Sequence, residues 1–179
     1  MDVIKTAIFD CWIIKPKVFK DDRGYFYESF QQERFQQLTK TVFSPIQDNE
    51  AFSTYGVIRG LHFQETPFAQ AKLVRSLQGS VLDVAVDLRK DSPSYGKVVT
   101  QVLSQENKEQ LFVPKGCAHG YAVLSPEAVV FYKTDAYYNP EAEGGILFND
   151  SELAIEWKIP ESDRILSKKD LVWPTFKNL

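Results

Sequence analysis

The sequence is poor in residues that bind metals, form disulfides or cross membranes. Its 179 residues include two histidines, two cysteines and one methionine. Cys11 and Cys117 form no CxxC pair and are too few for a disulfide scaffold, which favours a reducing, cytoplasmic setting. The longest apolar runs, such as 128–132, fall far short of the roughly 20 residues of a transmembrane helix. The first ten residues lack the long apolar stretch of a signal peptide.

Strong charge of either sign is also missing. The formal net charge is −3, so no overall field would draw the chain to nucleic acid or to an anionic membrane, and neither partner is expected. An anionic ligand would therefore have to be met by a few local cations. No repeat, low-complexity segment or linker interrupts the sequence, so we expect a single domain over residues 1–179.

Short strand-like segments recur between turns rich in Gly, Pro, Asn, Asp and Ser. In 80–89 (SVLDVAVDLR), large apolar residues alternate with Asp and Ala, as in a strand. Helix is sparse, with one short amphipathic helix expected in 29–40 and turns or short helices in 150–157 and 167–170. Many short strands are typical of a sandwich, jelly roll or barrel. The expected strands are 57–63, 72–77, 81–88, 97–103, 110–113, 121–124 and 128–133.

The two histidines lie in different sequence patterns. His119 belongs to VPKGCAHGY, whose P-x-G-x-x-H form resembles the second motif of cupins, which are small jelly-roll proteins. His62 stands where cupins usually carry H-x-H with a nearby glutamate. Because a zinc or iron site needs about three N or O ligands, we expect the jelly roll without a metal.

Polar residues crowd the strands around His62, where a core would be apolar. Arg59, Lys72, Tyr132 and the aspartates of DVAVD (83–87) all fall in or beside predicted strands. An imidazole is a usable base at neutral pH once a carboxylate orients it, and a tyrosine is a plausible acid for the opposite face. A core histidine satisfied by one hydrogen bond is the alternative, but the group as a whole favours proton transfer in a cleft.

Arg59 and His62 impose a condition on their strand. Residues three apart in a regular strand face opposite sides. If both side chains line one pocket, the strand must be irregular between them. We therefore predict a bulge or sharp bend at Gly60–Leu61.

Seven ordered segments carry a resemblance to a known family: 21–30, 47–49, 56–64, 70–96, 111–125, 131–150 and 166–170. Along them the sequence is similar to dTDP-4-dehydrorhamnose 3,5-epimerases. The resemblance implies an all-β, cupin-like double-stranded β-helix (jelly roll) with a few short helices. The departures are small: Phe63 replaces a common tyrosine, and Tyr121 stands where phenylalanine often follows the glycine.

The resemblance also implies the chemistry. The substrate would be dTDP-4-dehydro-6-deoxy-D-glucose, whose C3 and C5 hydrogens flank the C4 ketone. Each hydrogen can leave as a proton if the enolate is stabilised, and the ketone serves as the electron sink, so no cofactor is implied. The product would be dTDP-4-dehydro-L-rhamnose, a precursor for cell-surface polysaccharide made in the cytoplasm.

Matched to the family pattern, four residues take catalytic roles. His62 would remove the proton, with Asp170 holding its ring. Lys72 would stabilise the oxyanion, and Tyr132 would return a proton from the opposite face. Asp83 leaves an alternative open, since its parity lets it point inward and pair with Lys72 or His62.

Each of these assignments has a structural alternative. Asp170 could close a capping box with Ser167, Lys72 could be a solvated edge-strand lysine, and Tyr132 could be a core tyrosine. Only an arrangement in which these residues share one cleft would separate the two interpretations.

The resemblance assigns further residues to the nucleotide sugar. Arg23 and Arg59 would contact the pyrophosphate, and Tyr138 would stack on thymine. The family forms homodimers in which an N-terminal segment reaches the neighbouring subunit, where Arg23 could serve the partner's site together with Glu28. The other assigned residues are Gln47, Asn49, His119, Glu143 and Lys169.

Two other functions stay open at this point. One is a single-centre epimerase that acts at C3 or C5 alone, because the same four catalytic residues serve either outcome. The other is a cupin of a different kind, either metal-dependent or purely sugar-binding.

Overall fold

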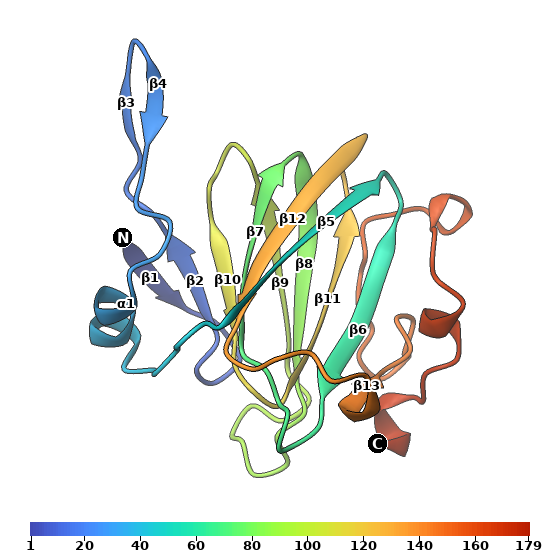
Figure 1. Cartoon of the computed structure of the whole chain (residues 1–179). Helices are drawn as coiled ribbons and strands as arrows, with labels where there is room; N and C mark the ends of the chain where they lie inside the picture. The colour runs from blue at the N-terminus through green and yellow to red at the C-terminus, as the bar shows by residue number, and fades with distance from the viewer.

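The computed structural model describes residues 1–179, and the body of the fold is two antiparallel sheets packed face to face (Figure 1). In spatial order, one sheet contains β1 (Asp2–Lys5), β2 (Trp12–Lys15), β10 (Gln110–Val113), β7 (Lys72–Gln78), β12 (Glu127–Thr134) and β5 (Gln47–Thr54). The other contains β13 (Glu143–Gly145), β6 (Ile58–Gln64), β11 (Cys117–Val123), β8 (Ser80–Asp87) and β9 (Val98–Ser104). This arrangement confirms the expected all-β jelly roll.

Two smaller elements precede the sheets' central strands. β3 (Phe19–Asp21) and β4 (Gly24–Phe26) form a hairpin that projects from the body, at the upper left of Figure 1. The only α-helix, α1 (Gln32–Thr39), follows it and lies within the predicted 29–40. Four 3₁₀ helices complete the chain: Pro140–Ala142, Glu161–Asp163, Lys169–Leu171 and Phe176–Asn178. None of these helices is long and apolar enough to cross a bilayer.

The α-helix forms because its buried face carries a large aromatic residue. The side chain of Gln31 caps its N-terminus by accepting from the backbone N–H of Arg34, and Lys40 ends it in the left-handed conformation. Phe35 is fully buried, with its ring centroid 4.9 Å from that of Phe112 in β10. The helix thereby covers the part of the outer face of the six-stranded sheet that is formed by β2, β10 and β7. By contrast, residues 150–157 form only turns.

β8 is buried on both faces because a second layer covers the five-stranded sheet. Leu82 and Val84 pack against Trp157 and other residues of the C-terminal segment. Ala85 belongs to the core cluster between the two sheets. The alternation expected for 80–89 is therefore present, and it places the neighbouring Asp83 on the inward side of the strand.

The irregularity predicted in β6 is present. In the pairing of β6 with β11, His62 lies opposite His119 and Arg59 lies opposite Tyr121. Three residue steps on β6 thus match two steps on β11, which is the signature of a β-bulge. The extra residue turns Arg59 and His62 to the same side of the sheet.

Gly60 makes this bulge possible. Its φ is 121°, a value that residues with side chains rarely adopt, and it is joined to Leu61 by a cis peptide bond. A Cβ at position 60 would lie 2.6 Å from Cα of Gly120 and 2.8 Å from the carbonyl oxygen of His119. Glycine is therefore required here for both its conformation and its lack of a side chain.

Candidate active site

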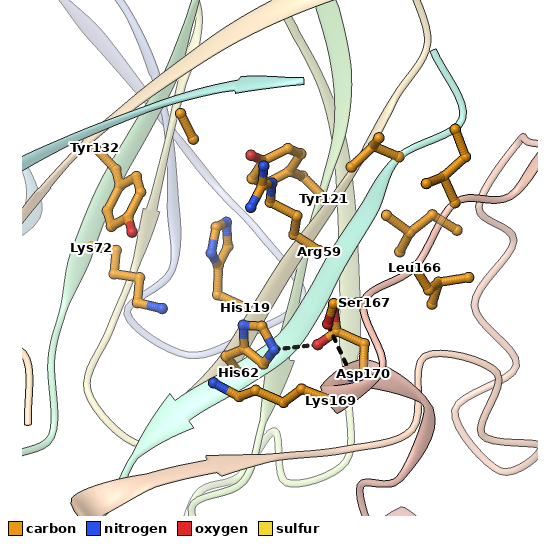
Figure 2. A pocket seen from close by; sticks show the side chains of 14 residues that line it. Arg59, His62, Lys72, His119, Tyr121, Tyr132, Leu166, Ser167, Lys169 and Asp170 are labelled. Carbon is orange, nitrogen blue, oxygen red and sulfur yellow. Dashed lines mark hydrogen bonds and ion pairs between the residues drawn. The ribbon is translucent and has the colours of Figure 1, made fainter. Parts of the chain in front are cut away.

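A cleft of about 560 Å³ opens between the two sheets (Figure 2). β6 and β11 supply one side, β7 and β12 the other, and the C-terminal segment closes part of the rim. All four residues predicted to be catalytic line this cleft. Its polar lining residues are Arg59, His62, Lys72, His119, Tyr121, Tyr132, Ser167, Lys169 and Asp170.

His62 forms a tight pair with the carboxylate of Asp170. Nε2 of His62 lies 2.5 Å from Oδ1 of Asp170, while the hydroxyl of Ser167 donates to Oδ2 at 2.8 Å. Burial raises the pKa of Asp170, but the hydrogen bonds from His62 and Ser167 outweigh it and hold this pKa below its usual value. Asp170 is therefore an ionised partner, and the capping interaction with Ser167 exists alongside the pair rather than instead of it.

A second imidazole–carboxylate pair lies deeper in the cleft. Nε2 of His119 is 2.8 Å from Oδ1 of Asp83, and the two side chains are 7 % and 0 % exposed. Oδ2 of Asp83 has no hydrogen-bond partner. The question left open by the sequence is thus answered by the structure: Asp170 lies beside His62, and Asp83 lies beside His119.

Lys72 reaches the cleft from β7 and is partly buried. Burial lowers its pKa to about 8, although the charges of Asp83 and Glu143 act in the opposite direction. Its ammonium therefore carries a positive charge at neutral pH and loses it in mild alkali.

Tyr132 projects from β12, next to Lys72 and on the sheet opposite His62 (Figure 2). Burial raises the pKa of Tyr132 above its ordinary value, with a further contribution from Tyr121. The phenol therefore keeps its proton at neutral pH. An imidazole and a protonated phenol thus face the cleft from opposite sheets.

Arg59 lines the cleft on the far side of the bulge from His62. It is exposed, and its Nε donates to Oγ of Ser53 at 3.1 Å while Nη2 donates to the carbonyl of Phe52 at 3.4 Å. An anionic ligand can therefore reach this side chain. The bulge in the pairing of β6 with β11 turns Arg59 toward the cleft, as a role in binding an anion there requires.

Five of the predicted binding residues are linked by hydrogen bonds and one ion pair beside the cleft. Gln47 donates to Asn49 at 2.9 Å, and the backbone N–H of Tyr138 donates to Gln47 at 3.1 Å. The Tyr138 hydroxyl donates to Glu143 at 2.8 Å, and Glu143 also pairs with Lys169. Gln47 and Asn49 lie in strand β5.

Arg23 and Glu28 are not brought to this cleft. Arg23 lies on the projecting hairpin and pairs with Asp21, and Glu28 pairs with Arg34 at 2.7 Å. The chain's own cleft is therefore built without them.

Sequence reasoning missed Tyr121 and Ser167. Tyr121 is two residues from His119 on the same strand and so shares its face; this parity was the available signal. Ser167 was considered only as a capping residue. Neither in the cleft nor elsewhere in the chain do three His, Cys, Asp or Glu side chains cluster in a way that could hold a metal ion.

A jelly-roll cleft in which a histidine–carboxylate pair faces a lysine and a tyrosine defines an acid–base enzyme of the cupin type. Comparison with known proteins narrows this class. Residues 5–178 match the family described as dTDP-4-dehydrorhamnose 3,5-epimerase. The chain belongs to this family of isomerases.

Individual relatives agree over nearly the full length. The chain is 52 % identical over 170 residues to the dTDP-4-dehydrorhamnose 3,5-epimerase of Escherichia coli K12, covering 95 % of this chain and 91 % of the relative. A crystal structure of the Elizabethkingia anophelis epimerase superposes with a TM-score of 0.97 at 54 % identity, covering 99 % and 97 %. A Legionella pneumophila enzyme, solved with dTDP-4-keto-L-rhamnose, gives a TM-score of 0.93 at 45 % identity, covering 98 % and 93 %.

Proposed function

We propose that this chain converts dTDP-4-dehydro-6-deoxy-D-glucose to dTDP-4-dehydro-L-rhamnose by inverting C3 and C5, in dTDP-L-rhamnose biosynthesis. The observation that carries the proposal is the His62–Asp170 pair at 2.5 Å, facing Lys72 and Tyr132 across one cleft. The substrate assignment rests on the family and on the ligand of the Legionella relative. The free, buried cysteines fit a cytoplasmic location.

His62 begins the reaction as the base. Because its Nε2 is occupied by Asp170, Nδ1 is the nitrogen that accepts the proton from the carbon next to the ketone. The electrons of the broken C–H bond form the C=C bond of an enolate, and the C4 oxygen becomes negative. The Asp170 carboxylate stabilises the imidazolium that results.

Lys72 and Tyr132 complete the inversion. The Lys72 ammonium stabilises the negative oxygen, an effect worth about 3 kcal/mol in comparable sites. Tyr132 then donates its proton to the carbon from the opposite face, which inverts the centre. Solvent restores the phenol and removes the proton from the imidazolium. The same steps serve both carbons because both flank the same ketone.

The decisive test is epimerisation in deuterated buffer, followed by NMR of the product. We expect deuterium at both C3 and C5, because each proton passes through a group that exchanges with solvent. Deuterium at one carbon only would identify a single-centre epimerase instead. Full turnover in the presence of a chelator would exclude a metal-dependent cupin, and any turnover would exclude a purely sugar-binding protein.

The pH dependence of kcat should follow the ionisation of Lys72. Since burial lowers its pKa to about 8, the charged form that stabilises the enolate is present below pH 8 and is lost as the pH rises through 8. We expect kcat to fall along this limb, measured between pH 6 and pH 10. Tyr132 cannot produce the limb, because burial raises its pKa above the ordinary tyrosine value, which is already well above that of Lys72. Lys72→Arg should be less active but should keep its charge, so the limb near pH 8 should disappear.

We further propose that two chains form a homodimer in which the β3–β4 hairpin of each reaches the other's cleft. Three aromatic residues of the hairpin, Phe19, Tyr25 and Phe26, are more than half exposed. Exposed aromatic side chains clustered in this way are typical of a surface that a partner subunit covers. Arg23 and Glu28 would then contribute to the partner's nucleotide site.

A further inference from the structure

The indole of Trp173 packs against the imidazole of His62, and the mechanism above gives it no role. The ring centroids are 6.2 Å apart and the ring planes meet at 69°, an edge-to-face arrangement within the range of interacting aromatic pairs. Trp173 is not among the residues that line the cleft. Any effect of the indole on the reaction would therefore act through His62.

The segment that carries Asp170 also carries Trp173, three residues later. Asp170 lies in the 3₁₀ helix Lys169–Leu171. Directly after the indole, the carbonyl of Pro174 accepts a hydrogen bond at 3.0 Å from the backbone N–H of Leu147, two residues beyond β13. The backbone is thus fixed on both sides of the indole, and the same short segment brings a carboxylate and an indole to one imidazole.

A glycine on β13 provides the space for the indole. Gly145 lies opposite His62 in the pairing of β13 with β6. A Cβ at position 145 would lie 2.5 Å from Cδ2 and Cε2 of Trp173 and 2.6 Å from its Nε1, closer than such atoms approach in proteins. The indole nitrogen is buried and has no hydrogen-bond partner in the chain. Packing, rather than a hydrogen bond, therefore determines where the indole lies.

Lys169 covers the indole from a further side. Its Nζ lies 5.6 Å from the centroid of the Trp173 ring, within the range of a cation–π contact, and also pairs with Glu143. The indole is therefore enclosed by His62, Gly145 and Lys169. A ring packed in this way has little freedom to move, and it restricts the rings on which it packs.

We propose that Trp173 is a positioning residue for His62. Nε2 of His62 lies 2.5 Å from Oδ1 of Asp170 (Figure 2), and rotation of the imidazole about its Cβ–Cγ bond would break this contact. The indole blocks that rotation, so Nε2 keeps its proton on the Asp170 side and Nδ1 stays directed at the cleft. This inference rests on the proposed function, because His62 is the base of that reaction.

Trp173→Ala tests the effect on catalysis. We expect kcat to fall about tenfold to 10²-fold, because a base displaced by up to about 1 Å loses a factor of this size. The Kd for thymidine diphosphate should stay within about threefold, since Lys169 keeps its pairing with Glu143. Trp173→Phe, which retains an aromatic ring, should keep kcat within about threefold of the wild-type value.

NMR of the imidazole nitrogens tests the positioning without any need for activity. The chain has only two histidines, so their ¹⁵N signals are readily assigned. In the wild type, neutral His62 should show one tautomer, with its proton on Nε2, and Trp173→Ala should show a mixture of both tautomers. His119 serves as an internal control and should not change, because Asp83 holds its Nε2.

Gly145→Ala tests the contact from the other side. The added methyl group would displace the indole, so this variant should lower kcat and mix the His62 tautomers as Trp173→Ala does. In a Trp173→Ala background the same substitution should change kcat by less than about twofold, because the methyl group then meets no ring.

Phe176→Leu is the matched control for general loosening of the C-terminal segment. It removes a ring that packs on Tyr95, with the ring centroids 5.4 Å apart, instead of on His62. We expect a lower Tm, a kcat within about twofold of the wild-type value, and an unchanged His62 tautomer.

The proposal is wrong if His62 keeps a single tautomer in Trp173→Ala, or if Gly145→Ala is as costly without the indole as with it. Equal losses of kcat and of the single tautomer in Phe176→Leu would also overturn it. The proposed function can fail separately, because a wild-type chain that does not epimerise still permits the NMR test. Mixed tautomers in Trp173→Ala and Gly145→Ala alone would then still support the positioning role.

Discussion

Replacing His62 with alanine is expected to abolish exchange of solvent deuterium into C3 and C5 and to lower kcat by about 10³-fold. His62 is the imidazole that has an ionised carboxylate behind it and a side chain 28 % exposed to the cleft. The other imidazole, His119, is almost fully buried, with its Nε2 held by Asp83. Removal of His62 therefore leaves no equivalent base.

His62→Ala should lose catalytic activity but keep its affinity for the nucleotide. Arg59 lies beyond the bulge and does not contact His62, so the Kd for thymidine diphosphate should stay within about threefold in His62→Ala. His62→Asn, which keeps a polar side chain but cannot act as a base, should behave in the same way. Exchange that persisted at either carbon would mean that another group removes the proton, with His119 the first to be examined.

Tyr132→Phe should separate proton removal from inversion. The phenol donates from the opposite face, so its loss should lower the rate of inversion by about 10²-fold to 10³-fold. Proton removal by His62 continues, and because His62 is partly exposed, its proton can exchange with solvent before it returns to the same face. Substrate recovered from deuterated buffer should therefore contain deuterium with unchanged configuration.

The measurement is NMR of recovered substrate and product over time. Tyr55→Phe, which alters an exposed tyrosine away from the cleft lining, serves as a matched control and should invert at the wild-type rate. If Tyr132→Phe formed inverted product at that rate as well, a different acid would have to supply the second proton. Loss of both exchange and inversion would instead place Tyr132 in the proton-removal step.

Strands that appear in the sequence as apolar or alternating runs between turn signals were predictable, and six other strands were missed. All seven expected strands are present, including β8 with its inward Asp83. β5 (Gln47–Thr54) was missed because QDNEAFST has little apolar periodicity; its position is determined by pairing along its whole length with β12. β13 was missed as well, and its pairing with β6 likewise joins segments distant in sequence. β1 pairs with β2 and β3 pairs with β4, and these local strands of three or four residues were too short to be predicted.

In the site, too, a feature set by local sequence was predictable and a pairing between distant segments was not. The bulge at Gly60 could be predicted because only a local irregularity turns Arg59 and His62 to one side. The choice between Asp83 and Asp170 could not be made from residues alone. Asp170 is 108 positions from its histidine, and it arrives there because the C-terminal segment folds back over the five-stranded sheet, an arrangement to which no local pattern corresponds.

The bulge in β6 has a consequence for motion during turnover. Arg59, which would bind the phosphates, and His62, which would remove the proton from the sugar, are three positions apart on strand β6. Lys72 and Tyr132 belong to the facing sheet. A change in the separation of the two sheets would therefore leave the spacing between Arg59 and His62 unchanged. It would alter the distances from His62 to Lys72 and Tyr132.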